Sequence, residues 1–114
     1  MDIRRGEIYL VSLDPTVGSE IKKTRPALII QNDVGNKYSP LTILAPITST
    51  PRAKKYPTEV NITAKESGLG SDSTVLLNQI RTVDKSRIAR KLGALSQAKM
   101  REVDEAIRIS LTIS

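Results

Sequence analysis

The chain has 114 residues, a length that suits one domain, and it contains neither histidine nor cysteine. That composition excludes nucleophiles paired with a histidine base, zinc sites built on thiolate or imidazole ligands, and disulfides. The net charge of +6 predicts a polyanionic partner such as nucleic acid, because neutralising phosphates releases counterions.

Seven short segments have the apolar patterning of β-strands. They are residues 7–13, 27–31, 41–48, 58–62, 73–77, 79–83 and 87–92, of which the fifth and sixth are either two strands or one long bent strand. Turn-forming residues are dense at residues 32–36 and 64–71. Pro46 indicates a sheet edge or a bulge near the end of the third strand, and Gly93 is expected to end the last one.

The loop between the first two segments carries three positive charges, Lys22, Lys23 and Arg25, directly before Pro26. Proline favours an extended conformation in the residue before it, so we expect Arg25 at the mouth of the second strand. A guanidinium fixed in this way suits a phosphate. A solvated basic loop is the simpler interpretation of the same charges.

Only the C-terminal segment has clear helical periodicity. Ser96 is a suitable N-cap, and Met100, Val103, Ile107 and Leu111 share one face, which we expect to pack on the sheet. Six or seven short strands with one long helix argue against βαβ units and predict a small, strongly bent antiparallel barrel or sheet with the helix packed on it. A core without Phe or Trp favours a dimer, and the helical face is compatible with a place in its interface.

The sequence does not predict contact with a membrane. No apolar run approaches the ~20 residues of a spanning helix, and the N-terminus lacks the apolar region of a secretory signal. The absence of cysteine fits a reducing cytosol. We therefore expect a cytoplasmic protein.

Two further segments are candidates for contacts with nucleic acid. Gln79 and Arg81 alternate with Ile80, so they share one face while Ile80 points to the core; glutamine can pair with a base edge and arginine with a base or phosphate. The alternative is an ordinary solvated face of a half-buried strand. Asn32 is interpreted first as a turn former and second as an RNA contact.

The segment at residues 50–57 is basic and contains an aromatic side chain. Arg52, Lys54 and Lys55 are most simply a funnel that follows a phosphate backbone, and Tyr56 is placed to stack on a base or to pack against its own loop. No cluster of metal ligands is visible, so neither a metal nor another cofactor is expected.

Five segments, in this order and spacing, resemble the MazF/PemK-type toxins of bacterial toxin–antitoxin modules. They are residues 5–9 (Arg-Gly-Glu-Ile-Tyr), 18–20 (Gly-Ser-Glu), 24–33 (Thr-Arg-Pro-Ala-Leu-Ile-Ile-Gln-Asn-Asp), 46–48 (Pro-Ile-Thr) and 77–87 (Leu-Asn-Gln-Ile-Arg-Thr-Val-Asp-Lys-Ser-Arg). The resemblance extends over nearly the whole chain, from residue 5 to about residue 109.

The resemblance implies that residues 1–114 form one toxin domain, mainly β with a C-terminal helix, in the small SH3-like antiparallel β-barrel shared with the gyrase poison CcdB. It implies a homodimer that cleaves single-stranded RNA, chiefly mRNA, in a sequence-specific and metal-independent way and so inhibits translation and growth. It also implies neutralisation by a cognate antitoxin whose flexible acidic C-terminal tail occupies the RNA groove.

The resemblance also assigns roles to residues. Arg25 and Thr48 match the family's catalytic pair, Ser19 and Glu20 match its first loop, and Gln79 matches a position in its RNA groove. Lys22, in the same loop, is counted with the RNA contacts.

RNA cleavage requires no histidine, because RNA brings its own nucleophile, the 2′-OH. Arg25 can clamp the scissile phosphate and Thr48 can donate its hydroxyl, leaving a 2′,3′-cyclic phosphate and a 5′-OH. A guanidinium has a pKa above ~12 and is a poor base near pH 7. Glu20 is therefore a possible base, although a salt bridge with a neighbouring cation explains it equally well. A gyrase poison on the same barrel and a non-catalytic single-strand binder are the alternative functions.

Overall fold

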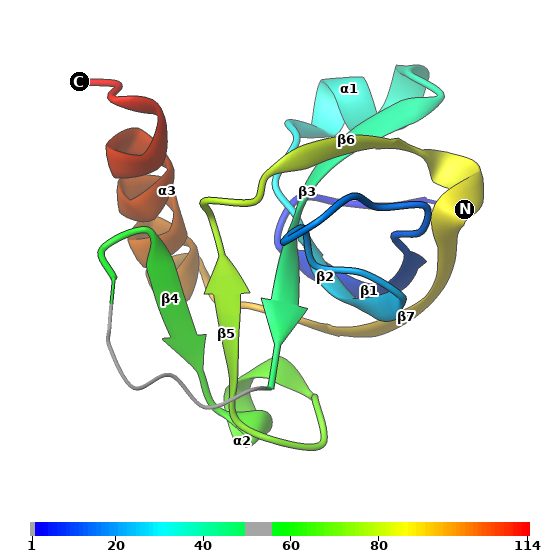
Figure 1. The fold of residues 1–114 in the computed structure, drawn as a ribbon. Helices are drawn as coiled ribbons and strands as arrows, with labels where there is room; N and C mark the ends of the chain where they lie inside the picture. Colours follow the sequence, from blue (N-terminus) through cyan, green and yellow to red (C-terminus); the bar gives the residue numbers. More distant parts are fainter. Residues whose placement is uncertain (1, 50–55) are drawn as a thin grey trace.

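The structure, a computed structural model, describes residues 2–49 and 56–114. The strands in these ranges are β1 (Glu7–Ser12), β2 (Thr24–Ile29), β3 (Leu41–Thr48), β4 (Glu59–Ile62), β5 (Ser73–Leu76), β6 (Arg81–Asp84) and β7 (Ile88–Ala94). The helical elements are α1 (Asp33–Tyr38), α2 (Ala64–Ser67), the 3-10 turn η1 (Lys85–Arg87) and α3 (Gln97–Leu111) (Figure 1). No helix in these two ranges is long and apolar enough to cross a bilayer.

The strands form one curled antiparallel sheet in the order β4-β5-β3-β2-β1-β7, with β6 paired to β3 off this path. The prediction of a mainly β, antiparallel fold with a C-terminal helix is confirmed. Among the described strands, β4 and β7 are the ends of the path and do not pair with each other, so "barrel" describes this open sheet only loosely.

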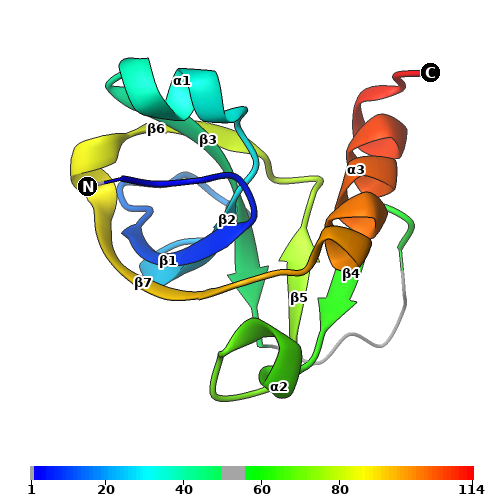
Figure 2. The same cartoon turned by 180° about the vertical axis from the view of Figure 1, so that it is seen from behind.

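Two apolar cores lie on opposite faces of the central strands. Neighbouring residues of β2 alternate between them: Leu28 packs in the core that includes α3, while Ala27 and Ile29 pack in the core inside the curl of the sheet. Figure 2 shows α3 standing beside β4 and β5, apart from the curled strands β1, β2 and β7. The sheet is therefore buried on both faces at its centre.

The helix α3 begins as predicted, with Ser96 as N-cap accepting a hydrogen bond from the backbone N–H of Lys99. Met100 and Val103 are buried in the core, as predicted, and Ile107 packs at its border. Leu111 is exposed, whereas Ala106 is buried in its place. The predicted stripe is thus right for three of its four members.

Two short helices stand where the sequence predicted only turns. In α1, Asn32 is the N-cap, and its Oδ1 accepts the N–H of Gly35 at 2.8 Å. In α2, Thr63 and Glu66 form a reciprocal capping box. The spacing Ser/Thr-x-x-Glu is a sequence signal for a helix start and could have predicted α2.

Two predictions about strand ends are wrong, and of the two alternatives for Pro46, an edge or a bulge, the edge is excluded. The second strand begins at Thr24 rather than residue 27, so Arg25 lies inside it, opposite Val11 of β1. Pro46 does not mark a sheet edge: β3 is an interior strand, and Pro46 lies where its partner changes from β6 to β5. Gly93 does not end β7, which continues to Ala94.

Candidate functional site

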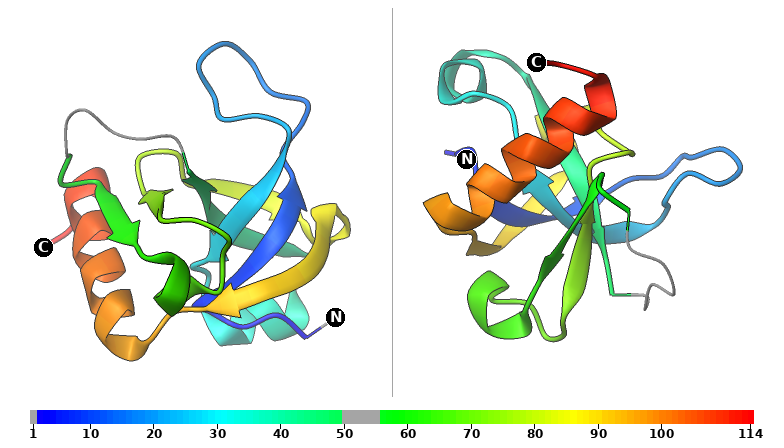
Figure 3. Two further views of the ribbon diagram at one scale, coloured as in Figure 1. Left: turned by 90° about the horizontal axis from the view of Figure 1, so that it is seen from below. Right: turned by 90° about the vertical axis from the view of Figure 1, so that its left-hand side faces the viewer.

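The loop between β1 and β2, residues 13–23, extends beyond the end of the sheet and carries several predicted site residues (Figure 3). Two arginines from the C-terminal half of the chain hold the first residues of this loop. Arg81 donates from Nη1 to the carbonyl of Leu13 at 2.9 Å, and Arg87 donates to the carbonyls of Ser12, at 3.3 Å, and Asp14. The guanidinium groups therefore fix the point where the loop leaves β1.

The return of the loop is fixed as well. The Asp14 carboxylate accepts the N–H of Lys23 at 3.0 Å, which ties the two ends of the loop together. Gln79 accepts the N–H of Ile21 on its Oε1 at 2.8 Å. The sequence did not predict these contacts, because they join segments far apart in the chain.

A surface hollow of about 390 Å³ lies between this loop and the segment before β6; we call it the Gln79 hollow. It is lined by Ser19, Glu20, Ile21, Pro46, Gln79 and Arg81, together with Asn78 and Ile80. Four of the predicted site residues, from two distant segments, thus meet at one place. The predicted strand alternation of Gln79, Ile80 and Arg81 is wrong, because β6 begins only at Arg81; all three residues line the hollow, and Ile80 also packs against the helix-side core.

Within that hollow, Glu20 turns back onto its own loop. Its Oε1 accepts the N–H of Val17 at 2.5 Å, and the N–H of Glu20 donates to the carbonyl of Val17 at 3.2 Å. Among the described residues, Glu20 forms no ion pair with Lys22 or Arg25. The salt bridge considered from the sequence is therefore not the reason for its position.

Arg25 is half-buried near the start of β2, and its Nε donates to the carbonyl of Lys22 at 2.8 Å. This bond holds the guanidinium to the loop, while both of its Nη nitrogens have no hydrogen-bond partner within residues 2–49 and 56–114. Arg25 lines a second hollow of about 290 Å³, formed with Pro26 and Ile47 on one side and Leu69, Gly70 and Ser71 on the other. We call it the Leu69 hollow.

Thr48 ends β3 and is buried, with 5% of its surface exposed. In the β2–β3 pair, Ile29 lies opposite Leu44 and Ala27 lies opposite Pro46. Extending this antiparallel register by two residues puts Arg25 opposite Thr48, on the same face of the sheet. Arg25 lines the Leu69 hollow, and so do Ile47 and Ser49, the chain neighbours of Thr48.

The remaining predicted RNA contacts lie elsewhere. Asn32 is at the far end of β2 from Arg25, and its Oδ1 is engaged in capping α1, as its interpretation as a turn former predicted. Tyr56 is exposed. The predicted funnel residues Arg52, Lys54 and Lys55 lie outside the described residues.

The sequence reasoning missed the Leu69 hollow. Residues 64–71 were predicted only to turn, and the hollow requires that segment to lie against β7 and the end of β3. Gly68, with φ +79°, and the closely following Gly70 are the one local signal of a shaped loop.

The open, curled antiparallel sheet with its C-terminal helix is the architecture of a class of small toxins. The chain matches the family described as PemK-like, MazF-like toxin of type II toxin-antitoxin system over residues 4–111, and it belongs to that family. The resemblance read from the sequence is therefore confirmed.

Solved structures of similar proteins agree with this assignment. MazF (Form-I) from Deinococcus radiodurans is 29% identical, with a TM-score of 0.83 and 98% of each chain covered. The Mycobacterium tuberculosis toxin MazF-mt6 is 28% identical, with a TM-score of 0.80, covering 95% of this chain and 98% of that one. An endoribonuclease in complex with its cognate antitoxin, from a mycobacterial species, is 23% identical at a TM-score of 0.81, covers 98% of this chain and 97% of its own, and shows the shared fold.

Proposed function

We propose that this chain is the toxin of a type II toxin–antitoxin module, acting in the cytoplasm as a sequence-specific, metal-independent endoribonuclease on single-stranded mRNA. Membership of the toxin family supports this proposal, as does the description of a similar mycobacterial protein as an endoribonuclease. The observation that carries it is the Leu69 hollow, which Arg25 lines together with Ile47 and Ser49, the chain neighbours of Thr48. By cleaving mRNA, the toxin inhibits translation and growth.

The chemistry uses the substrate's own 2′-OH as the nucleophile. It attacks the adjacent phosphorus, the bond to the leaving 5′-oxygen breaks, and the products are a 2′,3′-cyclic phosphate and a 5′-OH. Arg25 holds the scissile phosphate through its Nη nitrogens and stabilises the charge that develops there, while its Nε keeps the guanidinium against Lys22. Thr48 donates its hydroxyl to a phosphate oxygen.

Glu20 is our candidate for the base that takes the proton from the 2′-OH. The N–H of Val17 engages its Oε1, which fixes the carboxylate and leaves Oε2 to accept a proton. The anchors at Leu13 and Ile21 hold the ends of the loop that presents it. This role suits a histidine-free enzyme better than a neutral arginine, which is costly near pH 7.

We also propose a homodimer, and a cognate antitoxin whose flexible acidic C-terminal tail competes with RNA for the site. MazE-MazF structures from Deinococcus radiodurans and the mycobacterial antitoxin complex support the antitoxin partner. An acidic, disordered tail suits a chain with a net charge of +6.

The direct test is to incubate the purified protein with a long RNA in EDTA and to sequence the new ends. Cleavage at a recurring sequence with cyclic phosphate ends is expected. Loss of cleavage in EDTA with recovery in magnesium would contradict the mechanism. RNA binding without cleavage would favour the single-strand binder, and inhibition of gyrase instead would favour the poison.

A further inference from the structure

We propose that the Leu69 hollow binds one unpaired RNA base, belonging to a nucleotide directly next to the scissile phosphate. This subsite rests on the proposed nuclease function. It would make the nucleotide on that side of the phosphate a determinant of cleavage, read by the segment between α2 and β5 rather than by the loop between β1 and β2.

The position of the hollow is the first reason. Arg25, the candidate phosphate clamp, lines it, and so do Ile47 and Ser49, the residues on either side of Thr48 in the chain. A phosphate held between Arg25 and Thr48 therefore has this hollow beside it and the Gln79 hollow across the end of β3, where Pro46 contributes to its lining. The two nucleotides joined by that phosphate have one hollow each.

The size and chemistry of the hollow fit a base. Its volume of about 290 Å³ is at the lower end for small-molecule sites, which run from about 300 Å³ upwards, so it suits a single ring system. Pro26, Ile47 and Leu69 supply apolar surface for the ring face. Ser71 brings a hydroxyl that can pair with polar atoms at the ring edge, while the Ser73 hydroxyl donates to the carbonyl of Ser71 at 3.0 Å and can still accept a hydrogen bond.

An acidic side chain of an antitoxin fits less well. Among the described residues that line the hollow, Arg25 is the only charged one, and the others are apolar, glycine or serine. A carboxylate in the hollow would lose its hydration and gain only one cation, Arg25, which the scissile phosphate also needs. A base is less strongly hydrated, so its transfer onto apolar side chains costs less free energy.

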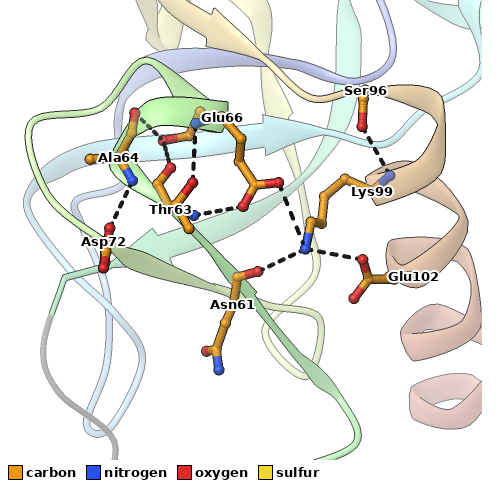
Figure 4. Close-up of polar contacts among 9 residues, drawn as sticks. Asn61, Thr63, Ala64, Glu66, Asp72, Ser96, Lys99 and Glu102 are labelled. Atoms are coloured by element: carbon orange, nitrogen blue, oxygen red, sulfur yellow. Dashed lines mark hydrogen bonds and ion pairs between the residues drawn. The ribbon is translucent and has the colours of Figure 1, made fainter.

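Hydrogen bonds and ion pairs hold the far wall of the hollow in place, and Figure 4 shows them for the residues behind it. The capping box joins Thr63 and Glu66 through hydrogen bonds of 3.1 and 2.8 Å. The N–H of Ala64 then donates to Oδ1 of Asp72 at 2.8 Å, which brings the end of the loop back to the start of α2. A preorganised wall binds a ligand with less loss of conformational entropy.

Two contacts beyond the loop fix this wall to the rest of the molecule. Lys99 of α3 reaches the carboxylates of Glu66, at 3.8 Å, and Glu102, at 3.0 Å (Figure 4). On the other side, α2 lies so close to β7 that a Cβ on Gly93 would be 1.9 Å from the carbonyl oxygen of Ser67. The wall therefore has a fixed place relative to β7 and α3.

The test combines protein variants that fill the hollow with RNA substrates that lack one base. Gly70 lines the hollow, and a Cβ added there meets no atom within 4 Å, so Gly70→Leu adds side-chain volume at the hollow without a clash at its Cβ. Ser71→Leu is a second filling variant, Gly70→Ala is the small one, and Ala98→Leu on the exposed side of α3 controls for added apolar surface. The substrates are an oligonucleotide with the mapped cleavage site and two versions that lack the base 5′ or 3′ of the scissile phosphate.

Wild type should lose about 10-fold or more in kcat/KM on one of the two abasic substrates, because the apolar contact of one base with the hollow is lost. Gly70→Leu and Ser71→Leu should show a similar loss on the intact RNA and no further loss on that abasic substrate. Gly70→Ala should show a smaller loss of kcat/KM, and Ala98→Leu should show none. Thermal unfolding of each variant checks the fold.

Filling variants that cleave intact RNA like wild type, or that suffer the full additional abasic loss, would overturn the subsite. Those outcomes leave the nuclease function intact, because wild type still cleaves. Failure of wild type to cleave any RNA would instead reject the proposed function itself.

Discussion

Oε1 of Gln79 accepts a hydrogen bond from the backbone N–H of Ile21 at 2.8 Å, across 58 positions of the chain. Because a backbone N–H can only donate, the amide oxygen of Gln79 must face the loop and its NH₂ group must face away from it. The side chain therefore anchors the loop with one end and offers a donor to the hollow with the other.

We expect the acceptor of Gln79 to control the loop. Gln79→Met removes the acceptor, and Gln79→Glu keeps an acceptor but loses the NH₂ group. The amide of Ile21 should lose its protection from hydrogen exchange in Gln79→Met and keep it in Gln79→Glu, measured by NMR. Asn78→Met, at an exposed neighbour in the same hollow, is the matched control and should leave this amide unchanged. Equal exchange in both Gln79 variants would show that the bond does not hold the loop.

The second prediction concerns the proposed catalytic pair. Arg25→Ala removes the preorganised donor to the developing charge, and cleavage should fall about 10²–10³-fold. Arg25→Lys keeps the charge but not the planar fork and should recover only part of the rate. Single-turnover cleavage with saturating enzyme measures the loss in the chemical step, and circular dichroism controls for folding. An Arg25→Ala rate near that of wild type would remove this residue from the mechanism.

Thr48→Val keeps the shape of a buried side chain and removes its hydroxyl. We expect slower cleavage, because the donor to the phosphate is lost, with little change in KM for RNA. A matched change on the neighbouring strand, Thr74→Val, takes away the hydroxyl that donates to Asn61 at 3.0 Å and tests a merely structural role. If both variants slow cleavage alike, Thr48 acts through the sheet and not on the phosphate.

Local patterns predicted much of this fold, and long-range contacts explain what they missed. Apolar runs and apolar alternation located each of the described strands, and Pro26 correctly predicted an extended Arg25. Gly93 was misjudged as a strand end, because its small size serves the close approach of Ser67 rather than a turn. No feature of the sequence near Gly93 predicts this contact with Ser67.

The candidate site was predicted as a set of residues but not as a geometry. The sequence placed Gln79 and Arg81 on one face, yet their contacts with Ile21 and Leu13 depend on how two distant loops meet. The anchoring role of these side chains therefore appears only in the folded chain. The Leu69 hollow was not predicted for the same reason, because distant segments of the chain form it.

The fourth prediction concerns the dependence of stability on pH. The hydrogen bond from the N–H of Thr63, and the charge of Lys99, hold the pKa of the Glu66 carboxyl below its ordinary value of 4.5. A lowered pKa in the folded state means that the ionised carboxylate stabilises the fold above about pH 4.5, and that this contribution is lost as pH falls through the folded pKa.

Glu66→Gln keeps the hydrogen-bonding shape and removes the charge. We expect it to lower the free energy of unfolding by about 0.5 kcal/mol near neutral pH, a modest value because the ion pair is partly exposed to solvent. The difference from wild type should vanish in acid, where Glu66 is protonated. Denaturant unfolding at several pH values measures it, and a difference that stays constant with pH would contradict the assignment.

The last prediction concerns charge and partner together. A homodimer of chains at +6 carries about +12, so RNA and an acidic antitoxin tail should compete for one basic surface. Lys54→Gln with Lys55→Gln removes two charges from a segment that the sequence predicts to follow the phosphate backbone. Binding of RNA and of antitoxin should weaken together, and the salt dependence of RNA binding should become flatter, because fewer counterions are released.

Arg101→Gln with Arg108→Gln removes the same charge from exposed positions on α3 and is the matched control. If overall charge alone attracts both partners, the two double variants will weaken binding equally. If the predicted funnel contacts the phosphates, only the Lys54 and Lys55 variant will flatten the salt dependence. Competition titrations on wild type test whether RNA and antitoxin bind the same surface, since simultaneous binding of both would rule out a shared surface.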